Sequence, residues 1–377
     1  MKNIVLYLQI KDLLLATYTA PNSPLNQKQI KTMAMIITGM LLGPHIQLFA
    51  IAMCVPLAIK LPSIVRRFER FVADPRINVE KCFAPFVRAM VNALGNETAY
   101  LIIDCTKVGS KCRVLFIGLY YHGTVLPLIW ETVKGKKGHV TAQLQKKLLN
   151  KIYKRFRYHR QVIVLGDAEF SNGPVIKQLK EHNWGFVFRF QSNYLVQLDD
   201  DLQLSAEKIG QMDGIQAGQV SHWEEITFTA THQIPHLTMT IHWGEGAQEP
   251  LYLISNLAVS YQPHILYEMR YAVETLFGNQ KARGFQLART HMITPAHIDR
   301  LMLALAIATS LTLGLGTHLI VTGQSNQVDR ADRRDLSLFQ LGWRWLYRLL
   351  ALNRLHELKF TFCWDFQLPP AGYQPAK

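Results

Sequence analysis

Four residues in the segment 264–285 could form one chemically active face: Tyr267, Arg270, Glu274 and Lys281. At about 100° per residue on an α-helix, the other three fall within roughly 60° of Tyr267. The face would present a carboxylate flanked by two cations and a phenol. On an isolated helix the same charges are ordinarily a solvated face, because Arg270 and Glu274 are also a plain i, i+4 pair.

Two further carboxylates follow apolar runs upstream of this helix. Asp104 lies in the run 99–109 and Asp167 in the run 160–173. The pattern predicts strand, strand, strand, helix, strand, with an acid at the end of the first and fourth strands. Continuous Ile, Leu and Val runs are typical of strands covered by helices on both faces. A single Asp after such a strand is usually a turn or cap residue, but two of them upstream of an acidic helix favour a functional interpretation.

The number and type of these acids suit a divalent-metal site. Mg²⁺ is a hard ion that takes carboxylate, water and phosphate oxygens. Three acids can flank the pair of ions that serves an in-line phosphoryl displacement. Arg270 and Lys281 on the same helix would then hold a DNA backbone against that site.

In this combination the residues resemble the DDE transposases of bacterial insertion sequences, in the class whose third acid lies within a Tyr-x2-Arg-x3-Glu-x6-Lys signature. The segment 167–170 is similar to the family motif around the second Asp, and the resemblance covers about residues 13–352. It implies an RNase H-like α/β core, a mixed sheet flanked by helices. As catalytic and metal-binding residues it implies Asp104, Asp167 and Glu274. Glu169 is a further candidate acid, since two residues along an extended chain it would point the same way.

The same resemblance implies an activity and partners. Two Mg²⁺ ions, replaceable by Mn²⁺, would serve cleavage of double-stranded DNA at the element ends and joining of the freed 3′-OH to target DNA. Tyr267, Arg270 and Lys281 would position phosphates, and synapsis of two ends implies at least a homodimer. A metal-dependent nuclease on the same fold and a non-catalytic DNA-binding derivative remain as alternatives.

Composition shifts predict five units. Residues 1–95 are a helical DNA-binding or support domain, 96–191 the first part of the core, 192–250 a β-rich insertion, 251–328 the second part of the core, and 329–377 a helical C-terminal segment. Within the insertion, Trp223 and Trp243 could stack on an unpaired base, although core packing is the more common role of tryptophan. The C-terminal segment could pack on the core, on DNA or on a second subunit.

Charge favours a polyanionic partner. The net charge is +14, and ten Lys or Arg residues lie between Thr132 and Gly166 with no acid among them. Such a run is often only a solvated helix face, but here neutralisation of phosphates explains it better and makes DNA affinity depend on salt. The helix expected within the run supplies the DNA-binding candidates Lys146, Lys147, Lys151, Lys154 and Arg155.

Other features exclude several classes. Five cysteines without a Cys-x-x-Cys pair argue against a disulfide framework or zinc site, and no signal peptide is recognisable, so a reducing cytoplasm is expected. Two uncharged stretches, 32–59 and 301–328, are long enough to span a membrane. We interpret both as buried helices instead, the first broken at Gly43-Pro44 and the second ending near Leu313.

Overall fold

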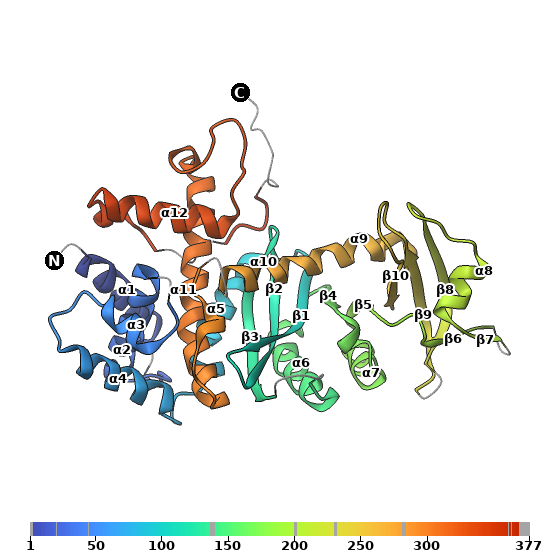
Figure 1. Ribbon diagram of the computed structural model, residues 1–377, viewed down its shortest axis with the longest axis horizontal. Helices are drawn as coiled ribbons and strands as arrows, with labels where there is room; N and C mark the ends of the chain where they lie inside the picture. The colour runs from blue at the N-terminus through green and yellow to red at the C-terminus, as the bar shows by residue number, and fades with distance from the viewer. Residues whose placement is uncertain are drawn as a thin grey trace.

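The computed structural model (Figure 1) describes residues 3–19, 21–43, 45–135, 140–199, 202–229, 232–280, 284–360, 362 and 364–368. Its centre is a ten-stranded mixed sheet with the strand order β3-β2-β1-β4-β5-β10-β9-β8-β6-β7. This confirms the mixed α/β class. The strands are β1 (Ala99–Val108), β2 (Cys112–Tyr121), β3 (Thr124–Lys134), β4 (Val162–Gly166), β5 (Gly185–Arg189), β6 (Leu195–Asp199), β7 (Leu202–Ser205), β8 (Val220–Phe228), β9 (Ile234–His242) and β10 (Leu251–Ser255).

The first part of the sheet has the predicted order of three strands, a helix and a fourth strand. β1, β2 and β3 form an antiparallel meander, and β1 also pairs in parallel with β4, which pairs in parallel with β5. The parallel connections run through α6 (Ala142–Phe156) and α7 (Gly173–Glu181). Every residue of β4 is buried, as expected for an apolar strand in the middle of a sheet covered on both faces.

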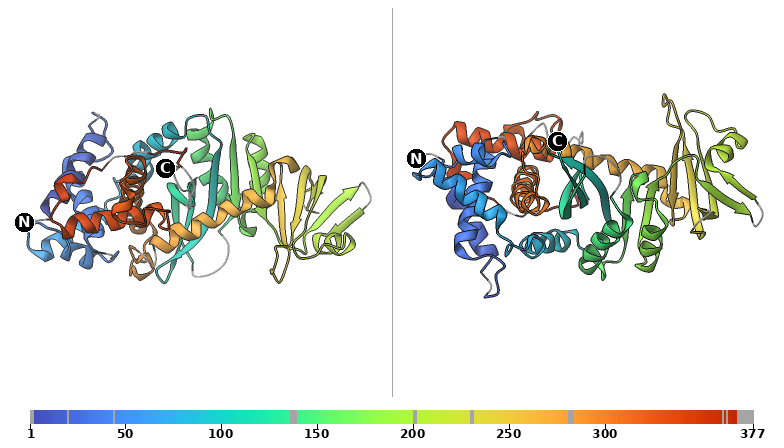
Figure 2. Two further views of the ribbon diagram at one scale, coloured as in Figure 1. Left: turned by 90° about the horizontal axis from the view of Figure 1, so that it is seen from above. Right: turned by 60° about the horizontal axis from the view of Figure 1, so that its bottom comes forward.

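Helices cover both faces of this part of the sheet (Figure 2). One face carries α5 (Val79–Leu94), α6 and α7. The other carries α9 (Pro263–Glu268) and α10 (Ala272–Gly278), joined by a 3₁₀ turn over Met269–Tyr271. The helix expected around Arg270 therefore forms, but it is wound more tightly for one turn in its middle.

The strand-rich segment after β5 extends the same sheet. β10 pairs with both β5 and β9, and α8 (Ala206–Met212) follows β7. Trp223 packs against the core, and the Trp243 indole donates to the Ala247 carbonyl oxygen at 2.9 Å. Packing thus accounts for Trp223, whereas the role of Trp243 and the division of the chain into five units remain predictions.

The N-terminal part of the chain is helical, with α1 (Ile4–Thr17), α2 (Gln27–Leu42), α3 (Leu48–Met53) and α4 (Leu61–Ala73) preceding α5. As expected, the first uncharged stretch is broken after Leu42. Figure 1 shows the long helix α11 (Pro295–Val321) between these helices and the sheet. By length and composition α11 could cross a membrane, but 83% of its most apolar window is buried inside the protein.

The prediction that this helix ends near Leu313 was wrong, because α11 continues to Val321. Its glycines serve close packing with α12 (Leu338–Ala351) rather than helix termination. A Cβ on Gly316 would lie 2.0 Å from the Leu338 carbonyl oxygen, and one on Gly342 would lie 1.9 Å from the Thr312 carbonyl oxygen. Only glycine therefore permits the backbones of α11 and α12 to approach so closely.

Gly342→Ala is expected to destabilise the protein by about 1–3 kcal/mol, the usual cost of forcing extra volume into a packed interface. The apparent melting temperature should fall by several degrees. The matched control is Gly244→Ala, whose new Cβ would meet only the Ala247 Cβ at 3.8 Å. Equal melting temperatures for the two variants would contradict the packing explanation.

Candidate active site

Strand pairing places Asp104 and Asp167 beside one another. The last residue pair of the parallel β1–β4 ladder is Ile103 with Gly166, so each aspartate is the residue that follows this pair along the chain. Asp167 comes directly after β4, as expected. Asp104 does not end its strand, because β1 continues to Val108 along its other neighbour, β2. The prediction that the first strand ends at Asp104 was therefore wrong. Asp104 still lies beside Asp167, because the pairing of β1 with β4 ends just before these two residues.

Both aspartates are also held by the backbone. The Asp104 carboxylate accepts from the Cys105 backbone N–H at 2.6 Å, and the Asp167 carboxylate accepts from the Ala168 N–H at 2.8 Å. The second contact caps a 3₁₀ turn over Ala168–Phe170. Each side chain is thus oriented by the residue that comes after it.

Arg270 joins all three predicted acids. Its Nη2 lies 3.0 Å from Asp104 Oδ2 and 3.6 Å from Asp167 Oδ2, and its Nη1 lies 3.1 Å from Glu274 Oε1. The side chain of Arg270 is 12% exposed and that of Asp104 15%, whereas those of Asp167 and Glu274 are 41% and 62% exposed. The guanidinium is therefore buried, and Glu274 is the most exposed of its three partners.

Burial controls the protonation of this group. It raises the pKa of Asp104 to about 6, although Arg270 and the Cys105 N–H act in the opposite direction. The carboxylates of Asp167 and Glu169 raise it further. Burial lowers the pKa of Arg270, but the surrounding acids, Asp104 foremost, outweigh this and raise it overall.

The donor set fits a hard divalent cation, because three carboxylates already converge on one positive group. Among the residues that the structure describes, no group of three or more His, Cys, Asp or Glu side chains is placed to bind a metal ion. The Arg270 guanidinium lies between the oxygens instead.

Glu169 has a different environment from the one expected. It belongs to the 3₁₀ turn rather than to an extended strand, so the alternation argument fails. Its carboxylate lies 3.5 Å from the Arg113 guanidinium and accepts from the Val140 N–H at 2.5 Å. Sequence reasoning missed Arg113, although a lone charge within the apolar run 112–121 was a signal for such a buried pair.

The remaining residues of the signature are placed differently. The Tyr267 side chain is buried at 2% exposure, and burial together with nearby Asp167 raises its pKa. Lys281 lies outside the described residues. A cavity of about 530 Å³ opens beside Asp167 and is lined also by Arg189, Glu207 and Tyr252.

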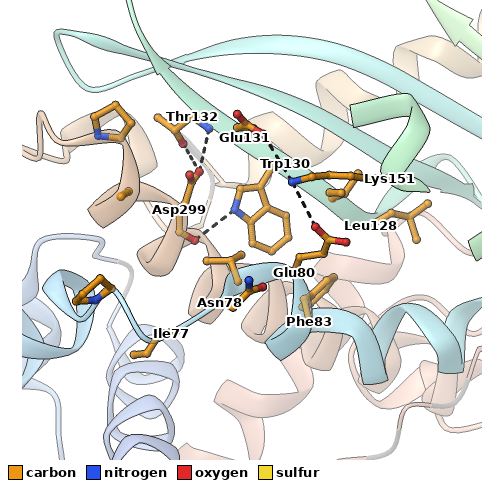
Figure 3. Close-up of a pocket in the computed structure, with 15 residues that line it drawn as sticks. Ile77, Asn78, Glu80, Phe83, Leu128, Trp130, Glu131, Thr132, Lys151 and Asp299 are labelled. Atoms are coloured by element: carbon orange, nitrogen blue, oxygen red, sulfur yellow. Dashed lines mark hydrogen bonds and ion pairs between the residues drawn. The ribbon is translucent and has the colours of Figure 1, made fainter. Parts of the chain in front are cut away.

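The basic candidates on α6 lie away from this site, because α6 covers the opposite face of the sheet from α10 (Figure 2). Lys147 Nζ lies 2.7 Å from Glu131, and Lys151 Nζ lies between Glu80 at 3.3 Å and Glu131 at 3.8 Å. Figure 3 shows Lys151 between these two acids at the edge of a cavity of about 430 Å³.

Other residues of the predicted basic set are in different surroundings. Lys154 and Arg155 are exposed, with no ion pair among the described residues, and Lys146 is half-buried. Lys136 and Lys137, counted in the same basic run, lie outside the described residues.

Comparison with known proteins decides the family. Residues 107–311, more than half of the chain, match the family described as Transposase DDE domain. The chain belongs to this family. No curated protein matches it. Among solved structures, the cryo-EM structure of piggyBac transposase synaptic complex with hairpin DNA matches at 13% identity and a TM-score of 0.43, covering 94% of this chain and 78% of that one.

Membership implies a DNA-cleaving and DNA-joining enzyme on an RNase H-like core, of a kind that generally uses divalent metals. The matched range contains Asp167 and Glu274 and begins three residues after Asp104. Because Asp104 lies outside the matched range, the evidence that it lies beside Asp167 is the β1–β4 register.

The raised pKa of Asp104 predicts how the stability of the metal-free transposase depends on pH. The unfolded-state value is about 3.9, so the folded state binds the proton more tightly. The resulting stabilisation, at most on the order of 3 kcal/mol, is present below about pH 4 and lost as pH rises to about 6. In EDTA, wild-type protein should lose melting temperature relative to Asp104→Asn over this range. Asp299, whose pKa burial also raises to about 6, affects both proteins equally. A constant difference between them would contradict the assignment.

Proposed function

We propose that this DDE transposase cleaves the ends of an insertion sequence of the signature class and joins the freed 3′-OH to target DNA. Asp104, Asp167 and Glu274 would hold two divalent metal ions, Mg²⁺ or Mn²⁺. The observation that carries the proposal is the contact of Arg270 with these three acids, which come from two strands and a helix. Buried charged groups in proteins are paired with opposite charges or coordinate metal ions.

The metal ions, when bound, supply activation of the attacking oxygen and stabilisation of the leaving oxygen. The protein's own contribution is positioning. Asp104 and Asp167 are fixed by the β1–β4 pairing and by their backbone contacts. Among the described residues, Arg270 is the cation in contact with all three acids, and it is suited to hold the phosphate of the strand being cut in a bidentate contact.

DNA is the partner that fits the family and the net charge of +14. The N-terminal helices, including α4 with its Arg66, Arg67 and Arg70, are proposed to contact DNA or to support the core. A homodimer and action in the cytoplasm also remain predictions.

Substitution of each acid tests the site. Asp104→Asn, Asp167→Asn and Glu274→Gln should each reduce Mg²⁺-dependent cleavage by more than about 100-fold, because even indirect metal partners contribute 10–100-fold. The substrate is a labelled duplex carrying the DNA that flanks the gene. Glu225→Gln, an exposed acid on β8, is the matched control and should cleave normally. Undiminished cleavage by Glu274→Gln would overturn the site assignment.

The products of the same reaction distinguish the alternatives. Labelled strands joined to a second DNA indicate transposition, whereas cleavage without joining under varied conditions favours a nuclease. Binding without cleavage in Mg²⁺ and Mn²⁺ favours a non-catalytic derivative.

The proposed contact of α6 with DNA is tested by salt dependence. Lys154→Gln with Arg155→Gln should reduce the slope of log affinity against log salt by up to about 2, since each phosphate contact contributes about 0.9. Lys147→Gln should change the slope less, because Glu131 already pairs with Lys147. Fluorescence anisotropy with a labelled duplex measures both. Unchanged slopes for the double variant would exclude these two residues from the DNA interface.

A further inference from the structure

We propose that Arg270 is a tethered counter-cation, which holds the three acids in the metal-free protein and is displaced from them when metal binds. A DNA phosphate would receive the departing guanidinium, so that DNA binding and metal loading favour each other. This inference rests on the proposed function for the assignment of Asp104, Asp167 and Glu274 as metal ligands.

The contacts of Arg270 are those of a cation in a binding site. One nitrogen, Nη2, serves both Asp104 Oδ2 at 3.0 Å and Asp167 Oδ2 at 3.6 Å, while Nη1 serves Glu274 at 3.1 Å. A metal ion held by the same oxygens would need the space that Nη2 fills. Metal binding by these three acids therefore requires Arg270 to move.

The contacts of Arg270 are also less complete than those of the buried Arg300. Its buried Nε has no hydrogen-bond partner among the described residues, and an unmet buried donor destabilises the arrangement. The buried Arg300, by contrast, donates through Nε to the Ile77 carbonyl oxygen and through Nη1 to those of Val72 and Ala296. Arg300 is fixed in place, whereas Arg270 would improve its hydrogen bonding in a different position.

Electrostatic repulsion moves Arg270 when metal arrives. Three ionised carboxylates and one guanidinium leave the group with an excess of negative charge, which attracts a divalent ion. Once the ion is bound, a guanidinium within a few ångströms of it is repelled, and in a buried site this repulsion is weakly screened. Glu274 is the most exposed of the three acids, so withdrawal past Glu274 brings the guanidinium to the surface.

At the surface, a DNA phosphate is the complementary partner, because its oxygens accept the planar fork of an arginine in bidentate fashion. Each ligand then favours binding of the other. A phosphate that binds Arg270 removes the cation that competes with the metal, and a metal that binds the acids frees Arg270 to bind phosphate. Such coupling is reciprocal in binding free energy.

The direct test is Mn²⁺ binding to the full chain without DNA, measured by the electron paramagnetic resonance signal of free Mn²⁺. Arg270→Gln should bind Mn²⁺ at least about tenfold more tightly than wild type, because the competing cation is gone. The matched control is Arg113→Gln, which removes an equally buried arginine that pairs with Glu169 instead. It should bind within about twofold of wild type. Equal or weaker binding by Arg270→Gln would overturn the proposal.

The two levels of the hypothesis fail differently. If Asp104→Asn and Asp167→Asn do not weaken Mn²⁺ binding in the wild-type or the Arg270→Gln background, the metal site itself is wrong. If they weaken it and Arg270→Gln still does not tighten it, only the role of Arg270 is wrong. Circular dichroism checks folding. If Arg270→Gln does not fold, Arg270→Lys replaces it: lysine keeps the charge but cannot bridge three acids, so binding should tighten by a smaller factor, and no tightening would overturn the proposal.

A second titration tests the coupling to DNA. Adding a 30-base-pair duplex should tighten Mn²⁺ binding by the wild type, after the Mn²⁺ bound by the duplex alone has been subtracted. The gain should be several-fold smaller for Arg270→Gln, which has no guanidinium to transfer. Equal gains in the two proteins would contradict the transfer to phosphate.

Discussion

Acidic side chains stay together in a partly buried place only if a cation or a proton neutralises part of their charge, and the candidate site of this transposase is arranged around that constraint. Two of the acids are brought together by the parallel pairing of β1 with β4. The helix that crosses this face of the sheet supplies both the third acid, Glu274, and the cation, Arg270, one helical turn apart. A single element thereby closes the group and neutralises it. The raised pKa of Asp104 shows that the neutralisation is incomplete, since burial outweighs the stabilisation from Arg270.

The parts of this arrangement that depend on local sequence could be predicted. The apolar runs around Asp104 and Asp167 indicated the strand order correctly, and the spacing of Arg270 and Glu274 predicted their contact. Relations between distant segments could not be predicted. Asp104 lies within β1 and beside Asp167 because β4 ends at this point while β2 continues alongside β1. That Glu169 faces Arg113 depends on a 3₁₀ turn. The continuation of α11 through its glycines depends on the close approach of α12, which no pattern within α11 reveals.

The basic residues of α6 show that charge balance, too, depends on contacts between distant segments. Along the chain, Lys147 and Lys151 have no acid nearby within the run, which favoured an interface with phosphates. In the folded protein Glu131 approaches both from β3, and Glu80 approaches Lys151 from α5. Part of the apparent excess of positive charge is therefore balanced between elements. Exposed ion pairs of this kind contribute little stability, but they reduce the charge that remains for DNA and direct attention to Lys154 and Arg155.

Consecutive residues of α11 connect the sheet to the N-terminal helices. The Asp299 carboxylate accepts from the Thr132 N–H at 2.9 Å on β3, and its carbonyl oxygen accepts from the Trp130 indole. Arg300, the next residue, donates to the carbonyl oxygens of Val72 in α4 and of Ile77. Since α11 is buried along most of its length, a displacement of either side would have to break buried hydrogen bonds. Any DNA contact made by the N-terminal helices would therefore be held at a fixed position relative to β3, and through β2 and β1 relative to Asp104.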